Sequence, residues 1–587
     1  MAVSAAGASE ATTVENKITA CPLAIFNVID ESAYAEFRAV GADAVIFELS
    51  SELKAVDGNG AEIASITETE EVATSHDAQL IYNVDDVATL NNLITYLGEN
   101  DKKTAVATSS QAVAVTASGE NRLRVFARAG NVVGKAAAAD EIKAACIAGA
   151  QTIIIDGKTD YDTVRYIQSR LKAVWVTTSG GTEDIADAFS MGVYGVVTPS
   201  VKGYNKVVGL ISSAAKNKEY ILGRAPYNVA HRGLTVSHAE NTVEAIRDAA
   251  RAGADHVEID IRLTKDKRIV LLHDDPVQYA MFNPDGTTAS GRISQMTLAE
   301  LKALDMKNGD KISTLDEVFS AANGEYEKDL TYLIEVKDEN TTNELVELFA
   351  EKVKEYDMGD RIALITFHNG HFANLKRYLP EIPVSLLCYT DKGSTVEEKA
   401  FSFRSGIDMQ YNGNGGMTSF YGDGTSRSAY AAAYKYLAKR GYALWLWTYD
   451  TSSMKEAMSR GVTGITTDDC TYLTGSVEKL VIEDEYAVTS LPKDGDKVKI
   501  DAVTYKGEIV KADAIVKVIS SDKNSEKAIL VYSPEDGFGL SGKTVTFVKK
   551  DEAEKGCGSK VNSTAAGISA LSAAFAYMVV KRRRTAK

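Results

Sequence analysis

Two acidic residues that alternate along one predicted strand are the first residues in this chain that could do chemistry. In HVEIDIRL, residues 256–263, Glu258 and Asp260 alternate with valine and isoleucine residues. Because successive side chains of a strand point to opposite faces, the two carboxylates share one face. Two oxygen ligands at this spacing suit a hard divalent cation, which would also offset the cost of burying two charges. The pattern predicts a metal site, although a solvated edge strand would show the same alternation.

Two histidines follow predicted strands on either side of this acidic pair. His231 ends the strand at 227–230, and His273 ends the strand at 268–272, in a chain that has only 7 histidines. This placement favours general acid and base chemistry near neutral pH. Farther along, LTYLIEVKD places Glu335 and Lys337 on one face of another predicted strand.

Glu335 is expected to be the third carboxylate ligand. Lys337 and Arg232 are expected to supply positive charge for an anionic substrate. An ordinary ion pair is the alternative for Glu335 and Lys337.

The surrounding sequence predicts alternating strands and helices. Residues 242–252 have small and aliphatic side chains at helical spacing and end at Gly253, so they are expected to form a helix that covers the acidic strand. In a barrel of such βα units the chemistry lies at the C-terminal ends of the strands. Nine strand candidates occur between residues 228 and 467, one more than such a barrel needs, and 267–273 is the candidate for a hairpin extension. Residues 278–316 are expected to be an insertion near the site.

The motifs AHRG, ENT, VEIDIRLTKD, LLHD, MTLAELKALD, ISTLDEV, IEVK, LWLWTYD and GITTDD occur in this order. Together they resemble the glycerophosphodiester phosphodiesterase family over about residues 226–473. The resemblance implies an α/β TIM (βα)8 barrel, a divalent cation held by Glu258, Asp260 and Glu335, and His231 with His273 as the acid and base pair. It also implies metal-dependent hydrolysis of glycerophosphodiesters to sn-glycerol 3-phosphate and an alcohol. The chain departs from the family pattern in HAENT, which lacks a proline, and in LITF, which lacks a serine.

Three further residues are expected near the site. Trp447 shares a strand face with Trp445 and is expected to line the substrate pocket. Glu240 and Asn241 are expected to support the ligands, although Asn241 could instead be only a helix N-cap. With oxygen ligands alone the cation should be Ca²⁺ or Mg²⁺, and an extracellular setting favours Ca²⁺.

The segment before this barrel is interpreted as a degenerate copy of it. AYAEFRAVGADAVIFELS parallels AIRDAARAGADHVEIDIR, an alignment that places Glu258 on Ile46 and Asp260 on Glu48. No HRG or HD motif occurs at the expected places, so the segment is predicted to bind no catalytic metal. The small β domain that follows the catalytic barrel is expected to be antiparallel, because its apolar and polar residues alternate between turn signals. The predicted divisions are 1–17 disordered, 18–220 degenerate barrel, 221–478 catalytic barrel, 479–550 small β domain, 551–560 linker, 561–580 transmembrane anchor and 581–587 basic tail.

Composition limits the possible partners. A net charge of −16 argues against a nucleic-acid-binding protein. Five widely spaced cysteines form no CxxC pair, and Cys557 in GCGS is a candidate for processing. The uncharged run at 561–580, followed by four basic residues, predicts a cell-surface protein anchored by a C-terminal transmembrane helix, with its catalytic barrel extracellular. Two alternatives remain open, a hydrolase of a glycerol phosphate polymer such as teichoic acid and a non-catalytic surface protein that binds phosphodiesters. The sequence indicates no oligomeric state.

Overall fold

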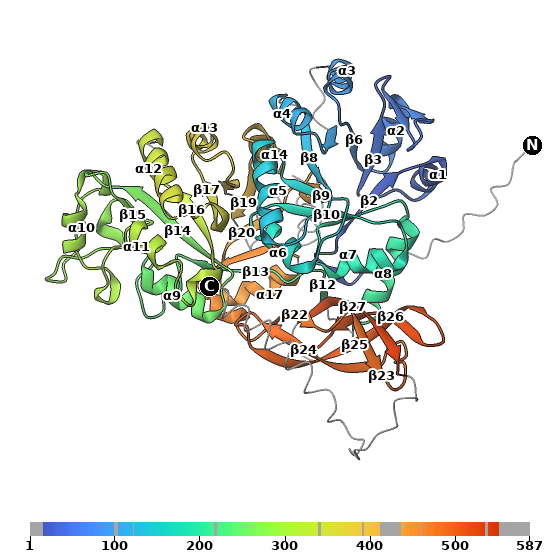
Figure 1. Cartoon of the computed structure of the whole chain (residues 1–587). Coiled ribbons are helices and arrows are strands. Elements are labelled where there is room, and N and C mark those ends of the chain that lie inside the picture. Colours follow the sequence, from blue (N-terminus) through green and yellow to red (C-terminus); the bar gives the residue numbers. More distant parts are fainter. Residues whose placement is uncertain are drawn as a thin grey trace, which may run out of the picture.

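The computed structural model describes residues 16–98, 104–120, 123–215, 220–337, 342–389, 393–410, 436–459, 461–534 and 538–550. These residues form two parallel α/β barrels and a smaller β sheet that lies beside both (Figure 1). Within them no helix has the length and apolar character needed to cross a membrane. The predicted anchor at 561–580, the linker, the basic tail, Cys557 and residues 1–15 lie outside the described residues.

The first barrel is complete, with eight parallel strands. Its ring closes because β2 pairs with both β11 and β3. The strands are β2 (Leu23–Val28), β3 (Ala44–Leu49), β6 (Gln79–Asn83), β7 (Ala105–Thr108), β8 (Arg124–Ala129), β9 (Thr152–Ile155), β10 (Ala173–Thr177) and β11 (Gly195–Thr198), and the hairpin β4 (Lys54–Val56) and β5 (Glu62–Ser65) extends from β3. The helices are α1 (Glu31–Val40), α2 (Ile66–Ser75), α3 (Val87–Leu97), α4 (Gln111–Gly119), α5 (Lys135–Ile147), α6 (Tyr161–Ser169), α7 (Thr182–Ser190) and α8 (Val201–Ser212).

The second barrel also closes on itself, through the pairing of β13 with β21 and β14. Its parallel strands are β13 (Tyr227–His231), β14 (His256–Leu263), β16 (Thr331–Val336), β17 (Ile362–Thr366), β18 (Val384–Cys388), β19 (Gly406–Gln410), β20 (Leu444–Tyr449) and β21 (Gly464–Thr467). The ninth candidate, β15 (Ile269–Leu271), pairs antiparallel with β14, which confirms the predicted hairpin. The helices are α9 (Val243–Ala252), α10 (Leu298–Ala303), α11 (Leu315–Ala321), α12 (Thr342–Glu355), α13 (Asn369–Tyr378), α14 (Gly393–Ser402) and α17 (Thr451–Ser459).

Single-turn 3-10 helices complete this barrel. Three lie in the predicted insertion, η1 (Val277–Tyr279), η2 (Ile293–Gln295) and η3 (Lys307–Gly309), and three lie elsewhere, η4 (Glu327–Asp329), η5 (Gly359–Arg361) and η6 (Cys470–Leu473). The insertion packs around its own small apolar cluster, which includes Met281, Ile293 and Leu301. It therefore forms an ordered wall beside the barrel mouth.

Local sequence explains the helix that covers the acidic strand. The Thr242 hydroxyl accepts a hydrogen bond from the Ala245 N–H and so caps α9. Gly253 ends the helix with φ 91°, a left-handed conformation that favours glycine. The buried face of α9, Ala245, Ile246 and Ala249, packs toward the barrel, so that β14 is covered by helix outside and filled by side chains inside.

The strand registers of the two barrels correspond all the way around. In the first barrel Trp175 pairs with Gly195, and in the second Trp445 pairs with Gly464. Each tryptophan occupies the space above its glycine, where a Cβ atom would approach the ring to 2.7 Å in the first barrel and 2.0 Å in the second. The strand pairings of each barrel can be followed from strand to strand, starting at its Trp–Gly pair. This comparison matches five site positions of the second barrel to residues of the first. The matched pairs are His231 with Asn27, Glu258 with Ile46, Asp260 with Glu48, Glu335 with Asn83, and Asp408 with Ile154.

This register agrees with the sequence alignment of β14 with β3. A common origin of the two barrels stays a prediction. The mouth of the first barrel is filled by mutual contacts: Arg128 donates to both oxygens of Asp156 and to Asn83, which donates to Glu48.

The two barrels pack floor to floor, through the N-terminal ends of their strands. Thr152 at the start of β9 donates to the Gly441 carbonyl at 2.8 Å, and His256 at the start of β14 lies 2.7 Å from the Ser169 carbonyl through Nε2. One apolar cluster runs from the interior of the first barrel through Trp175 to Trp445 in the second. The C-terminal mouths therefore open away from each other.

The smaller sheet joins both barrels. Its strands are β22 (Val477–Val481), β23 (Glu485–Val488), β24 (Lys497–Thr504), β25 (Ile509–Ser521), β26 (Ser525–Tyr532) and β27 (Gly539–Lys549), together with β1 (Ile18–Thr19) and β12 (Ile221–Leu222) from the segments that lead into the two barrels. The strands from β24 to β27 are antiparallel, as expected, but β12 and β23 pair with β27 in parallel, and β1 pairs with β12 in parallel. The antiparallel arrangement predicted for residues 493–550 is thus confirmed, and the parallel strands β1, β12 and β23, which lie outside that stretch, were not predicted. Two-residue strands carry no periodicity that a sequence pattern could reveal.

Candidate active site

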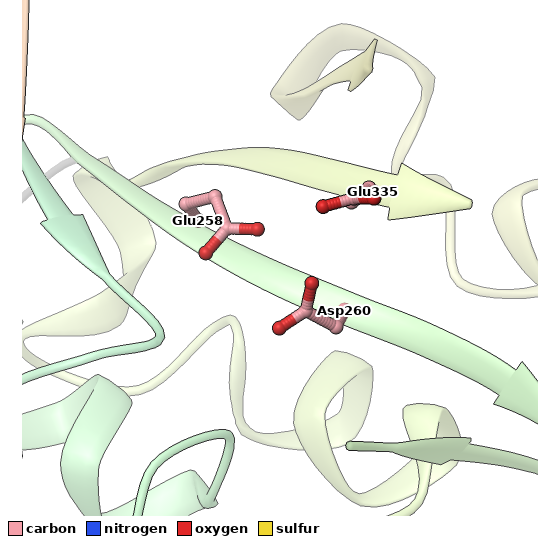
Figure 2. A group of neighbouring side chains, drawn as sticks. All are labelled: Glu258, Asp260 and Glu335. Carbon is pink, nitrogen blue, oxygen red and sulfur yellow. The ribbon is translucent and has the colours of Figure 1, made fainter. Parts of the chain in front are cut away.

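Three carboxylates converge at the C-terminal end of the second barrel. Glu258 and Asp260 come from β14 and Glu335 from the neighbouring β16, where Asp260 and Glu335 are paired in register. One oxygen of each lies within 4.8 Å of the others, and Figure 2 shows the three groups facing a common space. Their side chains are buried, because the barrel interior surrounds them.

The electrostatics of this trio follow from burial and proximity. Burial, with the neighbouring charges of Asp260 and Glu335, raises the pKa of Glu258 well above its usual range. Burial and the charge of Asp260 raise the pKa of Glu335 to about 7. Burial alone would raise the pKa of Asp260 too, but Lys337 and Arg232 beside it hold that pKa below its ordinary value. The positive charges of Lys337 and Arg232 therefore do not fully offset the negative charge of the three carboxylates.

These residues fit a divalent cation with oxygen ligands. Lys337 Nζ lies 2.8 Å from Glu335 Oε2 and 3.2 Å from Asp260 Oδ1. Among the described residues, Asp260 Oδ1 and Glu335 Oε1 are nevertheless buried without a hydrogen-bond partner of suitable geometry. Three buried carboxylates, two of them with an unsatisfied oxygen, are the kind of donor set that Ca²⁺ and Mg²⁺ prefer.

Each predicted catalytic histidine is paired with an aspartate. His231 Nδ1 lies 2.6 Å from Asp468 Oδ1, just after β21, and His273 Nδ1 lies 2.8 Å from Asp274 Oδ1. A carboxylate at Nδ1 holds the proton there in the neutral imidazole and leaves Nε2 for chemistry. His231 Nε2 is 4.0 Å from Glu258 Oε2, which places it beside the carboxylate trio. Burial lowers the pKa of His273, an effect that Asp260 and Asp274 only partly oppose.

The two aspartates were not predicted as site residues. Asp468 lies in GITTDD and Asp274 in LLHD, so both stood within motifs that the sequence resemblance had already identified. The hydrogen bond from His231 lowers the pKa of Asp468, which keeps that carboxylate ionised.

Arg232 connects the turn after β13 to the carboxylates. Its backbone N–H donates to Glu258 Oε2 at 3.2 Å, and its Nη1 donates to Glu240 at 2.9 Å. Arg232 and Gly233 have φ values of 57° and 88°, and a Cβ atom on Gly233 would meet the Ala245 backbone carbon at 2.8 Å. The glycine of AHRG is thus required for α9 to pack closely against this turn.

Asn241 makes two hydrogen bonds with Asp260. Its Nδ2 donates to Asp260 Oδ2 at 2.9 Å, and its Oδ1 accepts from the Asp260 backbone N–H at 3.0 Å. The helix N-cap is Thr242, so the alternative that Asn241 is only the cap was wrong. In the part of the chain that the structure describes, Glu240 is linked to the carboxylates through Arg232, whose Nε lies 3.6 Å from Asp260 Oδ2.

One pocket of about 940 Å³ is lined by most of the candidate residues, with Asp260, Glu240 and Asn241 outside its lining. His231, Arg232, Glu258, His273, Glu335, Lys337 and Trp447 all line it. On one side the insertion contributes Arg292 and Gln295. Phe367 and Tyr389 also line the pocket, and the Trp447 ring packs against them with centroid distances of 5.6 and 5.9 Å. The pocket therefore offers a phosphodiester both charged groups and an aromatic surface.

Comparison with known proteins identifies the barrel. A model of the glycerophosphoryl diester phosphodiesterase family matches residues 231–471. A glycerophosphodiester phosphodiesterase from Caldanaerobacter subterraneus subsp. tengcongensis is 30% identical over 260 residues, which cover 43% of this chain and 97% of that protein. The chain belongs to the glycerophosphoryl diester phosphodiesterase family. It is thus a phosphoric diester hydrolase, as the sequence motifs predicted.

Other similar proteins also match only part of this chain. A glycerophosphodiester phosphodiesterase from Bacillus altitudinis is 27% identical over 168 residues, which cover 27% of this chain and 64% of that protein. The crystal structure of a glycerophosphodiester phosphodiesterase from Parabacteroides distasonis is 24% identical, with a TM-score of 0.33, and the match covers 42% of this chain and 94% of that one.

Proposed function

We propose that the second barrel hydrolyses glycerophosphodiesters to sn-glycerol 3-phosphate and an alcohol, with a divalent cation held by Glu258, Asp260 and Glu335. The convergence of two His–Asp pairs and three buried carboxylates on one pocket carries this proposal. Membership in the glycerophosphoryl diester phosphodiesterase family supports the substrate class.

The chain's own residues would divide the work of proton transfer and charge stabilisation. Nε2 of one histidine accepts the proton of the attacking oxygen, and Nε2 of the other donates a proton to the leaving alcohol. The attacking oxygen belongs either to water or to the neighbouring hydroxyl of the glycerol moiety. Lys337 and Arg232 face the negative charge of the phosphate. The bound cation would neutralise the phosphate and polarise its P–O bonds.

The identity of the cation follows from its ligands and from the proposed location. Carboxylate oxygens suit Ca²⁺ and Mg²⁺ alike, and a cell-surface enzyme would meet Ca²⁺ at higher concentration. We therefore propose Ca²⁺ as the resident cation, with Mg²⁺ as the alternative.

A substrate panel tests the function directly. Release of sn-glycerol 3-phosphate is measured from glycerophosphocholine, glycerophosphoethanolamine and a glycerol phosphate polymer, before and after EDTA treatment and after Ca²⁺ or Mg²⁺ is added back. We expect release from the small diesters, its loss with EDTA and its recovery with Ca²⁺. No release from any substrate would reject the function, and release that EDTA leaves unchanged would reject the cation. Release from the polymer alone would identify the chain as a polymer hydrolase.

The proposed location is the cell surface, with residues 561–580 as the anchor. It is supported by the uncharged run and the basic residues 581–584 that follow. The full-length chain should sediment with membranes, and a chain that ends at residue 550 should remain in the soluble fraction. If both remain soluble, the anchor is rejected.

A further inference from the structure

Asp408 is a buried carboxyl group that the chemistry described above does not use. It lies on β19, its side chain is 1% exposed, and it lines the pocket. Its Oδ1 is buried and has no hydrogen-bond partner among the described residues. Within the same part of the chain, no cation forms an ion pair with this carboxyl. Leu387, its partner on β18, is apolar and also lines the pocket.

The first barrel shows that the fold does not need a polar group at this position. Counting from the paired Trp–Gly positions, Asp408 pairs with Trp445, and Ile154 pairs with Trp175 in the first barrel. Ile154 is fully buried there and belongs to the apolar cluster. An aliphatic side chain therefore satisfies the barrel at this register, whereas a carboxyl without a partner lowers stability.

The free-energy cost of burying the Asp408 carboxyl is reflected in its raised pKa. Burial, with a smaller contribution from the charge of Glu335, raises the pKa of Asp408 to about 8. A group that destabilises the folded state and faces a binding pocket is best explained by a ligand that satisfies it.

We propose that Asp408 hydrogen-bonds a hydroxyl group of the glycerol moiety and so selects glycerol diesters over diesters that lack hydroxyls. A hydroxyl can donate to a carboxylate and accept from a carboxylic acid, so it satisfies Asp408 in either protonation state. A phosphate oxygen would be repelled by the carboxylate form. A quaternary ammonium group has no N–H to donate. This inference rests on the proposed function and deepens it, because it assigns the glycerol arm of the substrate to the β19 side of the pocket.

A pair of matched substrates isolates the hydroxyl contact. Glycerophosphocholine and the ethyl ester of phosphocholine share the phosphate and the choline, and only the first has free hydroxyls. We expect Asp408→Ile to lower kcat/KM for glycerophosphocholine about 10- to 100-fold, mainly through KM, because the loss of one hydrogen bond to a buried partner costs about 1–3 kcal/mol. Binding of the ethyl ester, measured as its Ki against glycerophosphocholine hydrolysis, should change less than about twofold, whichever oxygen attacks the phosphate.

Two further measurements separate binding from folding. The Tm of Asp408→Ile should equal or exceed that of the wild type, as the residue in the first barrel indicates. Asp408→Asn, which keeps the shape and a hydrogen-bonding side chain, should restore most of the glycerophosphocholine activity. Equal losses of affinity for glycerophosphocholine and the ethyl ester, or no loss for either, would overturn the inference. Absence of sn-glycerol 3-phosphate release by the wild-type enzyme would instead reject the proposed function.

Discussion

Replacing either His231 or His273 with alanine is expected to lower kcat by about 10²- to 10⁴-fold, because each variant loses a positioned proton donor or acceptor. Each imidazole is held at Nδ1 by an aspartate and presents Nε2 to the pocket. KM should change far less than kcat. Hydrolysis of glycerophosphocholine under substrate saturation measures the effect.

A third histidine provides the control. His238 pairs with Asp310 at 3.4 Å and does not line the pocket, so His238→Ala should retain nearly full activity. Circular dichroism and Tm verify that all three variants are folded. Near-normal kcat in either His231→Ala or His273→Ala would remove that histidine from the proposed chemistry. The double variant should lose little more than the more affected single variant, because the two groups act in one reaction.

Replacing Glu258 with glutamine is expected to abolish the cation-dependent activity. The change preserves the size of the side chain but puts a neutral amide where the cation would need a carboxylate. Cation binding can also be measured without activity: a ligand at 100 times its Kd stabilises the folded state by about 2.7 kcal/mol, which raises Tm. The wild-type protein should show this rise when Ca²⁺ is added after EDTA treatment, and Glu258→Gln should not.

The pH dependence of stability gives this prediction a second readout. The pKa of Glu335 is raised from 4.5 to about 7, so the folded state favours its protonated form. The metal-free protein should therefore lose stability as pH rises from about 4.5 through 7, and Ca²⁺ should raise Tm more at pH 8 than at pH 5. Both trends should weaken in Glu258→Gln.

Glu48→Gln is the matched control, because Glu48 occupies the register position of Asp260 in the first barrel. It should leave both the activity and the effect of Ca²⁺ on Tm intact. A Glu258→Gln enzyme that stays fully active and still responds to Ca²⁺ would place the cation elsewhere.

The parts of the site that could be predicted from sequence are those that obey strand periodicity. Glu258 with Asp260, and Glu335 with Lys337, alternate with apolar residues, and the structure places all four side chains within one group of contacts. The surplus strand β15 was predictable for a related reason, since a closed ring of eight parallel strands leaves no place for a ninth.

Other site residues leave little trace in a single sequence. Asp408 stands alone in GIDMQ, without a second charged residue at a strand spacing, and only the register shared with Ile154 shows that its carboxyl is unusual. Asp468 meets His231 across 237 residues of chain, a contact that the closing of the barrel creates. Asn241 was ambiguous because one side chain can either cap a helix or hold a ligand, and the neighbouring Thr242 takes the cap.

The junction between the barrels has a consequence for how this enzyme can be handled. At the floor of the second barrel the Tyr227 and Trp445 rings stack and His256 meets both edge-on, and the first barrel shields all three from water. The residues matched by the family, 231–471, begin after most of β13 and include nothing of that shield. A gene fragment limited to these residues would lack most of β13 and would expose the apolar residues at the N-terminal end of the barrel to water. For protein engineering, the shortest fragment of this hydrolase that should be expressed is therefore longer than the segment matched by the family, residues 231–471.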